Sequence, residues 1–365
     1  MEKNRSHKAS LIISAILIAG AAGLSAAARM VPGFAQWYST TVYPVLQGSL
    51  GKLCGQVSFS VSEVLCAVLP AALILDIIVV IVRRRKISHP VLTLLRHILI
   101  TVSILIFVYT ANCGINYYRQ PFADRDAFDK AAFSVDELAD FCEYSVLQIQ
   151  NSSGSHPDGI NYASGAKLAD GAVKAMEKLS DSPDISFCGL EGLRGYYPRP
   201  KQLTWLSGFF SMMGVSGIYS PFTIEANVNG MMTDLEKPFT SCHELSHLRG
   251  FMNEGEANFI GWLACIGSDD SSFRRSGWLI AWIYAGNSLY SADPDRYYSI
   301  RKKLPEDALR ELEENSLFWS THENKASEVQ DRVNDAYLKS NGQDHGIQTY
   351  GQLTTLMLMW YSQKD

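Results

Sequence analysis

The chain has 365 residues, enough for two or three domains, and 47% of them are hydrophobic against 19% charged. Residues 1–120 hold eleven Lys and Arg but only three Asp and Glu, a net charge of +8, so the remainder carries −13 of the total of −5. This asymmetry excludes a single cytosolic globule. Nucleic acid is not expected as a partner, because the acidic remainder would repel phosphate.

Three apolar runs occupy the basic third of the chain, and each is long enough to cross a hydrocarbon core of about 30 Å as a helix. For the first run the alternative is a cleaved signal peptide, because Ser25–Ala28 resembles a cleavage site. The apolar region of a signal peptide is usually only about 7–15 residues, and two further runs follow, so retention is favoured. We therefore expect a membrane anchor over residues 1–115 with three transmembrane helices, at about 9–28, 64–82 and 91–111.

Two ionisable residues, Asp76 and Arg96, interrupt the second and third runs. Ionisable groups are costly in lipid, so such a pair marks either a functional site or a structural ion pair. We expect the structural pair, near the cytoplasmic end of a helical hairpin, with Arg96 extending toward the interface.

Basic residues predict the orientation, since short cytoplasmic loops hold the excess of Lys and Arg. Arg83–Lys86 separates the second and third runs and should lie inside, as should the basic N-terminus. Three crossings then place residues 116–365 outside. The expected location is the cell membrane, with the lipid bilayer as a partner, a cytoplasmic N-terminus and an extracytoplasmic domain.

The predicted outer domain is mainly helical. Ser134 opens a helix to about Gln150 with a capping-box pattern, and residues 167–179 repeat apolar side chains at helical spacing. Residues 217–229 have the composition of one strand, which Pro221 confines to an edge or bulge. Everything from Cys242 onward predicts helices. The expected fold is therefore mainly α, with three N-terminal transmembrane helices followed by an α+β domain.

The sequence His243-Glu244-Leu245-Ser246-His247 is an HExxH motif. On a helix, residues four apart share one face, so both imidazoles can bind one metal ion. Glu244 is then placed to act as general base for the attack of water on a carbonyl. The alternative is a surface helix with two solvated histidines.

A catalytic zinc ion usually takes three protein ligands, and two candidates for the third follow the motif. Gly250 is a natural helix stop, and Asn253 is a plausible N-cap for a second helix. That arrangement brings both Glu254 and Glu256 within reach of the histidines, so the residues alone leave the choice open.

The segment Asn253-Glu254-Gly255-Glu256-Ala257-Asn258 resembles the Asn-Glu-x-x-(Ala/Ser)-(Asp/Asn) pattern of thermolysin-like metallopeptidases, the gluzincins. The resemblance implies a zincin-like domain in which Glu254 is the third zinc ligand and Asn258 holds a histidine ring. The six residues between His247 and Glu254 form a shorter connection than gluzincins usually have. This spacing is closer to metzincins, whose ligand position is occupied here by Asn253, a poor zinc ligand. Glu254 is therefore expected, with Glu256 as the alternative.

The whole chain also resembles a bacterial membrane family, domain of unknown function 3810. That family has no assigned substrate, so the resemblance implies an architecture more than an activity. The motifs that carry it are Gly114–Arg119, Tyr219–Asn229, Pro238–Thr240, His243–His247 and Glu254–Phe259.

Two further features are candidates for a role in catalysis. The expected strand at 217–229 is either an edge that pairs with extended substrate or a plain structural strand. Tyr337, His345 and Tyr350 are candidates to stabilise an oxyanion, although most residues of this kind are structural.

The function we expect is that of a membrane-anchored zinc metallopeptidase. His243, His247 and Glu254 would bind Zn²⁺, and Glu244 would be the general base. The substrate would be a soluble or membrane-associated peptide or protein. Because the motif lies outside every apolar run, cleavage would take place in water or at the membrane surface. The alternative is a non-catalytic zinc-binding membrane sensor or assembly scaffold.

Overall fold

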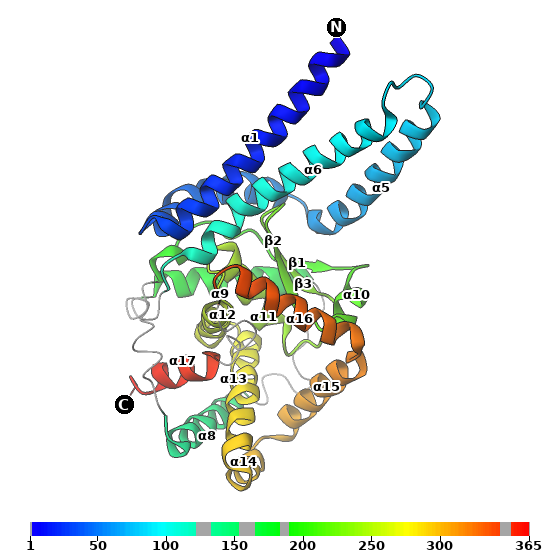
Figure 1. Cartoon of the computed structure of the whole chain (residues 1–365). Helices are drawn as coiled ribbons and strands as arrows, with labels where there is room; N and C mark the ends of the chain where they lie inside the picture. The colour runs from blue at the N-terminus through cyan, green and yellow to red at the C-terminus, as the bar shows by residue number, and fades with distance from the viewer. Residues whose placement is uncertain (1, 122–132, 153–164, 183–189, 344–351, 365) are drawn as a thin grey trace. The chain divides into compact units, whose positions relative to one another are not determined.

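A computed structural model of the protein describes residues 2–121, 133–152, 165–182, 190–343 and 352–364. Over these ranges the protein is mainly helical, with one three-stranded sheet (Figure 1). The chain forms two compact units: the first comprises Met1–Gln120 with Ser220–Glu225, and the second comprises Pro121–Tyr219 with Ala226–Asp365. The sequence alone places a boundary near residue 115 and gives no sign that residues 220–225 join the first unit.

The first unit contains three long apolar helices, as the sequence predicts: α1 (Glu2–Met30), α5 (Val61–Val82) and α6 (Pro90–Asn112). Each contains a segment long and apolar enough to cross a membrane. Helix α6 packs against both α1 and α5 (Figure 1).

Short helical segments lie between α1 and α5 and directly after α6, and none of them was predicted from the sequence. A buried cluster that includes Tyr38, Tyr43 and Ile115 packs part of the connection after α1 against the turn after α6. The hydroxyl of Tyr38 also donates to the carbonyl oxygen of Ala111 at 3.0 Å. The segments are α2 (Phe34–Trp37), π-helical η1 (Tyr38–Val42), α3 (Tyr43–Leu46), π-helical η2 (Gln47–Gly51), α4 (Lys52–Cys54) and the 3₁₀ turn η3 (Gly114–Tyr118).

The expected ion pair between Asp76 and Arg96 is wrong. The partner of Asp76 is His97, whose Nδ1 lies 2.9 Å from Oδ2 of the carboxylate. The guanidinium of Arg96 instead donates to the carbonyl oxygen of Leu92 at 3.0 Å and to the hydroxyl of Thr93 at 3.1 Å. Neighbouring residues on a helix point about 100° apart, so only one of Arg96 and His97 can face α5 at this level.

The expected single strand at 217–229 is also wrong, because a turn divides it into β2 (Gly217–Ser220) and β3 (Glu225–Asn229). Ile224 in this turn has φ 51°, a conformation that β-branched residues rarely adopt. After the turn, the Glu225 carboxylate accepts hydrogen bonds at the start of α5, from Val61 N at 3.2 Å and Ser62 N at 2.8 Å. Glu225 therefore satisfies backbone donors that α5 cannot satisfy itself.

The small sheet has the strand order β1-β3-β2, with β1 at Lys201–Leu203. Strands β1 and β3 are parallel, with Gln202 opposite Val228. Every residue of β3 is buried, whereas β2 forms one edge of the sheet.

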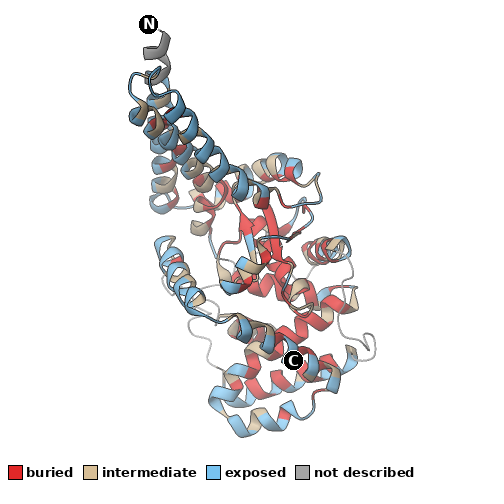
Figure 2. Ribbon diagram, turned by 90° about the vertical axis from the view of Figure 1, so that its right-hand side faces the viewer, coloured by how far each residue is buried: buried red, intermediate tan, exposed pale blue. Residues whose placement is uncertain are grey.

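The second unit supplies the remaining helices, and they confirm those predicted from Ser134, across 167–179 and after Cys242. Figure 2 shows buried residues gathered on the strands and the central helices, with exposed residues on the outer ones. The described elements are α8 (Val135–Ser152), α9 (Gly165–Asp181), the 3₁₀ turn η5 (Leu190–Leu193), α10 (Ser207–Met212), α11 (Lys237–Leu248), α12 (Glu254–Gly267), α13 (Ser271–Ala292), α14 (Pro294–Arg301), α15 (Glu306–His322), α16 (Lys325–Ser340) and α17 (Gln352–Tyr361).

Aromatic packing fixes α12 within this unit. The ring of Trp262 lies with its centroid 5.8 Å from that of Trp278 on α13 and 4.9 Å from that of Trp360 on α17. Both pairs meet edge to face, the arrangement that aromatic quadrupoles favour. These contacts hold the second half of α12 and leave its first turn, which begins at Glu254, to other neighbours.

A buried ion cluster joins α13 to α15. Arg275 has no exposed surface, and its guanidinium lies 2.9 Å from the Glu311 carboxylate and 2.8 Å from that of Asp307. Because a buried guanidinium is costly without partners, these two carboxylates are required where Arg275 is present.

Candidate metal centre

Helix α11 carries the HExxH motif at the centre of the second unit. Pro238 occupies its first turn, where a missing N–H costs nothing, and every residue from Pro238 to Leu248 is buried. The rings of His243 and His247 lie on the same face, with centroids 4.5 Å apart and planes at 87°. Because the motif is buried, the alternative of two solvated histidines on a surface helix is wrong.

The end of α11 orients the second histidine. Gly250 has φ 84°, and the N–H groups of Gly250 and Phe251 bond back to the carbonyl oxygens of His247 and Ser246, at 2.8 and 3.1 Å. This turn aims the Phe251 carbonyl at the ring of His247, and Nδ1 of the ring donates to it at 2.7 Å. In the neutral ring Nδ1 therefore keeps the single proton, and Nε2 has its lone pair available for a metal ion.

Helix α12 begins with the third candidate ligand. Oδ1 of Asn253 accepts from the backbone N–H of Glu256 at 3.0 Å, which caps the helix, while its Nδ2 donates to Oε1 of Gln343. As the first helical residue, Glu254 places its Oε2 3.4 Å from Nε2 of His243 and 3.6 Å from Nε2 of His247. One ligand atom from each of these three side chains lies within 4.8 Å of the other two.

Glu256 is not brought into this cluster. It lies in the same first turn of α12 and is buried, but the group of converging ligand atoms consists of His243, His247 and Glu254. Residues two apart on a helix point about 200° apart, so only one of the two carboxylates can face α11.

The protonation states of the three side chains follow from burial and from one another. Burial, and then the neighbouring His247, lower the pKa of His243. Burial alone would lower the pKa of His247, but the Glu254 carboxylate more than offsets it and raises that pKa to about 9. Burial opposes ionisation of Glu254, yet the two histidines hold its pKa far below the usual range. Only His247 must therefore lose a proton before all three can bind a metal ion.

Asn258 lies one turn after Glu254 and is within hydrogen-bonding reach of the His243 ring. Nδ1 of His243 and Nδ2 of Asn258 are buried and have no hydrogen-bond partner among the described residues. If the amide turns by 180°, its oxygen can accept from Nδ1–H, and Nε2 of His243 is then free for a metal ion. The supporting role that the gluzincin resemblance implies for Asn258 stays a prediction.

Glu244 lies beside the cluster, with Oε1 4.0 Å from Nε2 of His243. Burial raises its pKa to about 8, the charges of His247 and Glu254 act in opposite directions, and a backbone hydrogen bond from Tyr219 lowers it. A carboxyl group with a pKa near neutrality can both accept and return a proton.

The expected oxyanion residues receive no support from the described part of the chain. Tyr337 is exposed near the end of α16, and His345 and Tyr350 lie outside the described residues. Tyr284 of α13 is not among the residues predicted from the sequence, and its pKa is raised by burial and then by the carboxylates of Glu236 and Glu254. Its hydroxyl therefore stays protonated near the site, and no local motif marks it.

Arg249 is a second residue that the sequence analysis did not single out. Arg249 is buried and directly follows the last residue of α11. Its guanidinium donates to the carbonyl oxygens of Gly192, at 2.9 Å, and Arg194. It also lies over the ring of Tyr197, 5.7 Å from the centroid. Arg249 thus connects η5 and the residue that follows it to the end of α11.

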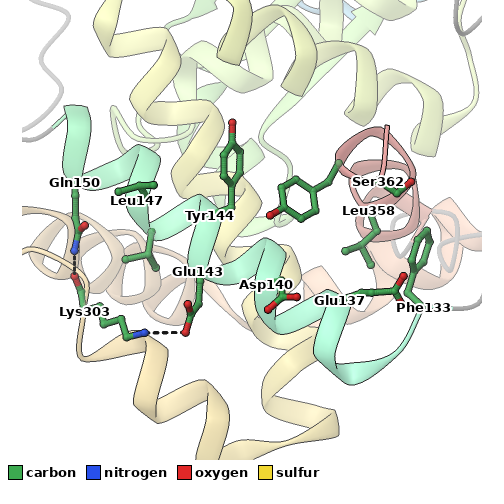
Figure 3. A pocket seen from close by; sticks show the side chains of 12 residues that line it. Phe133, Glu137, Asp140, Glu143, Tyr144, Leu147, Gln150, Lys303, Leu358 and Ser362 are labelled. Atoms are coloured by element: carbon green, nitrogen blue, oxygen red, sulfur yellow. Dashed lines mark hydrogen bonds and ion pairs between the residues drawn. The ribbon is translucent and has the colours of Figure 1, made fainter. Parts of the chain in front are cut away.

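A separate cavity of about 550 Å³ lies between α8 and α17 (Figure 3). Glu137, Asp140 and Glu143 line it, and Nζ of Lys303 lies 2.7 Å from the Glu143 carboxylate. None of the clustered side chains of α11 and α12 lines this cavity. It is therefore distinct from the candidate metal centre.

A model of the family described as "Protein of unknown function (DUF3810)" matches residues 38–358. The chain belongs to this family. The match confirms the family resemblance and includes α11 and α12. Comparisons with curated proteins and with solved structures gave no match. The description of DUF3810 names no activity, so any function rests on the site itself.

Proposed function

We propose that this DUF3810 protein is a membrane-anchored zinc metallopeptidase. The observation that carries the proposal is the convergence of His243, His247 and Glu254, with the carboxylate of Glu244 beside them. Two imidazoles and one carboxylate form a donor set typical of catalytic zinc, and three protein ligands leave a position for water or substrate.

The residues fit zinc in their chemistry as well as in their number. Phe251 holds His247 in the tautomer that leaves Nε2 free, and Glu254 is held ionised. Bound there, zinc would polarise a substrate carbonyl and lower the pKa of a water molecule. The carboxylate of Glu244 would take the proton of the attacking water and deliver it to the leaving amine.

A peptide substrate is supported by the sheet beside the motif. Strand β2 is an edge strand, and extended peptides bind to such edges through backbone hydrogen bonds. The backbone N–H of Tyr219 in this strand donates a hydrogen bond to the carboxylate of Glu244, so the edge strand lies next to the proposed base.

We further propose that the site lies outside the cytoplasm. Three apolar helices precede it, and the basic cluster Arg83–Lys86 lies between the second and third of them. With that loop and the N-terminus inside, three crossings place the second unit outside.

The decisive experiment compares the wild type with Glu244→Gln in the full chain in detergent. The substitution keeps the size of the side chain and removes its basicity. We expect about one zinc ion per chain in both proteins, because Glu244 is not among the three ligands, and a loss of peptide hydrolysis by several orders of magnitude in the variant.

Two controls test whether the measured hydrolysis depends on bound zinc. His243→Ala should lose both zinc and hydrolysis, and a chelator should abolish the wild-type activity reversibly. Wild-type protein that holds zinc but cleaves no member of a mixed peptide library, with a Glu244→Gln variant that keeps its cellular role, would replace the peptidase with a zinc-binding sensor or scaffold.

A further inference from the structure

Strand β2 lies unusually close to the side chain of Glu244. A methyl group added at Gly217 would be 2.6 Å from Oε1 of Glu244, 2.8 Å from its Cγ and 2.8 Å from Cγ2 of Thr240. Non-bonded carbon atoms prefer separations of about 3.5–4.0 Å, so no side chain fits at position 217 while Glu244 keeps its place. Only glycine lets the strand backbone approach the carboxylate this closely.

The same strand also holds the carboxylate by a hydrogen bond. The backbone N–H of Tyr219 donates to Glu244, two residues after the close approach at Gly217. Glu244 is only 3% exposed, and its Oε2 has no hydrogen-bond partner among the described residues. One side of the carboxylate is therefore fixed by the strand, while a buried oxygen is left to accept a proton or a hydrogen bond.

We infer that the backbone of β2 at Gly217 and Tyr219 positions the carboxylate of Glu244 for proton transfer. This inference rests on the proposed function, because it assigns positioning residues to the base of that reaction. Gly217 acts by having no side chain, and Tyr219 acts through its backbone N–H. A misplacement of about 1 Å in a reacting group can cost about 10²-fold in rate, so this contact would decide activity without touching the ligands.

The first test measures hydrolysis and zinc content of Gly217→Ala. The three atoms nearest to the added methyl group belong to the side chains of Glu244 and Thr240, not to the backbone. We therefore expect a folded protein that keeps its zinc and hydrolyses peptides about 100-fold more slowly. Gly208→Ala is the matched control, because a methyl group there meets only Sδ of Met231 at 3.7 Å, an ordinary contact. Unchanged hydrolysis in Gly217→Ala would overturn the inference.

A second substitution tests whether the loss has the proposed cause. Thr240→Ser removes the methyl group that lies 2.8 Å from the position of the added one, while it keeps the hydroxyl. Combined with Gly217→Ala, it should restore part of the lost rate, because the new methyl group can move away from Glu244. A general weakening of the fold would not be rescued by a further deletion in the core, since such deletions usually destabilise.

The third test does not depend on activity. We expect Gly217→Ala to lower Tm in the wild-type background and to lower it by less than half as much in a Glu244→Ala background, where Oε1 and Cγ are absent. Equal effects in both backgrounds would show that position 217 does not act on Glu244 and would overturn the inference. If the wild type hydrolyses no peptide, the proposed function fails, and this cycle still decides whether β2 holds Glu244.

Discussion

Gly261 of α12 faces the backbone of His243 on α11. A methyl group added at Gly261 would lie 3.0 Å from the backbone nitrogen of His243 and 3.2 Å from its Cα, which is tighter than nine in ten real contacts of a Cβ atom. We expect Gly261→Ala to separate the two helices by a few tenths of an ångström and to weaken zinc binding about tenfold, about 1.4 kcal/mol, within the usual cost of overpacking. Competition with a chelator of known affinity measures this change.

Gly267→Ala is the control for Gly261→Ala, because a methyl group at position 267 meets nothing within 4 Å. An equal loss of zinc affinity in both variants would rule out the contact with His243 as the cause.

The choice between the two candidate carboxylates is tested by their alanine variants. Glu254→Ala removes an oxygen 3.4 Å from Nε2 of His243 and should lose most bound zinc. Glu256→Ala keeps the three clustered side chains and should retain it. Zinc is measured per chain by atomic emission after gel filtration. The reverse order of zinc contents would mean that α12 presents its other carboxylate to the metal.

Without metal, the stability of the fold should fall as pH rises from 6.5 to 9. The pKa of His247 is raised from 6.5 to about 9 in the folded chain, so its contribution is fully present below pH 6.5 and is lost toward pH 9. Glu244 acts in the same direction, because its pKa is raised from 4.5 to about 8 and the folded chain resists its ionisation. Thermal melting of chelator-treated protein measures the effect.

A matched variant isolates the part of this pH dependence that comes from His247. Glu254→Gln removes the carboxylate that raises the pKa of His247, so Tm should change less between pH 6.5 and 9. Zinc affinity should rise over the same interval, since binding displaces the proton of His247. A Tm that rises with pH in the metal-free wild type would contradict the assigned protonation states.

The buried ion cluster between α13 and α15 predicts a large loss of stability in Arg275→Met. The substitution leaves the carboxylates of Glu311 and Asp307 without their guanidinium partner, and breaking a buried pair costs about 3–5 kcal/mol. Urea unfolding measures the free energy. Lys303→Met is the control, because its pair with Glu143 is half exposed and should change little. Similar losses in both variants would show that burial of Arg275 adds nothing.

The proposed orientation is tested by reporter fusions. A reporter that is active only outside the cytoplasm should be active when fused after Arg119 and inactive when fused after Lys86, because the positive-inside rule keeps Arg83–Lys86 in the cytoplasm. A cytoplasmic reporter should give the opposite pair of results. If both reporters reverse, the second unit lies in the cytoplasm.

Local signals explain what could be predicted from the sequence. The capping box at Ser134 forms as expected, with its hydroxyl accepting from Glu137 N at 3.2 Å and its N–H donating to the Glu137 carboxylate at 2.7 Å. Gly250 ends α11 in a left-handed conformation, and Asn253 caps α12. Each of these features depends on residues within one turn, so the connection that brings Glu254 back to the histidines could be anticipated.

Contacts between distant segments explain what could not be predicted. Nothing near Gly217 or Gly261 in the sequence indicates that Glu244 or the backbone of His243 lies against them. Ile224 belongs to a residue type that disfavours the conformation it adopts, so the turn that divides the expected strand has no local signal. The partner of Asp76 is likewise decided by how two helices face each other, which the order of Arg96 and His97 does not reveal.

Asn253 also connects the site to a part of the chain ninety residues away. One end of its amide caps α12 directly before Glu254, and the other end bonds to Gln343, which follows α16. A single side chain thus connects the first turn of α12, which carries Glu254, to the segment that leads out of α16. A change in the position of Gln343 would therefore reach the start of α12, and with it Glu254, through the cap at Asn253.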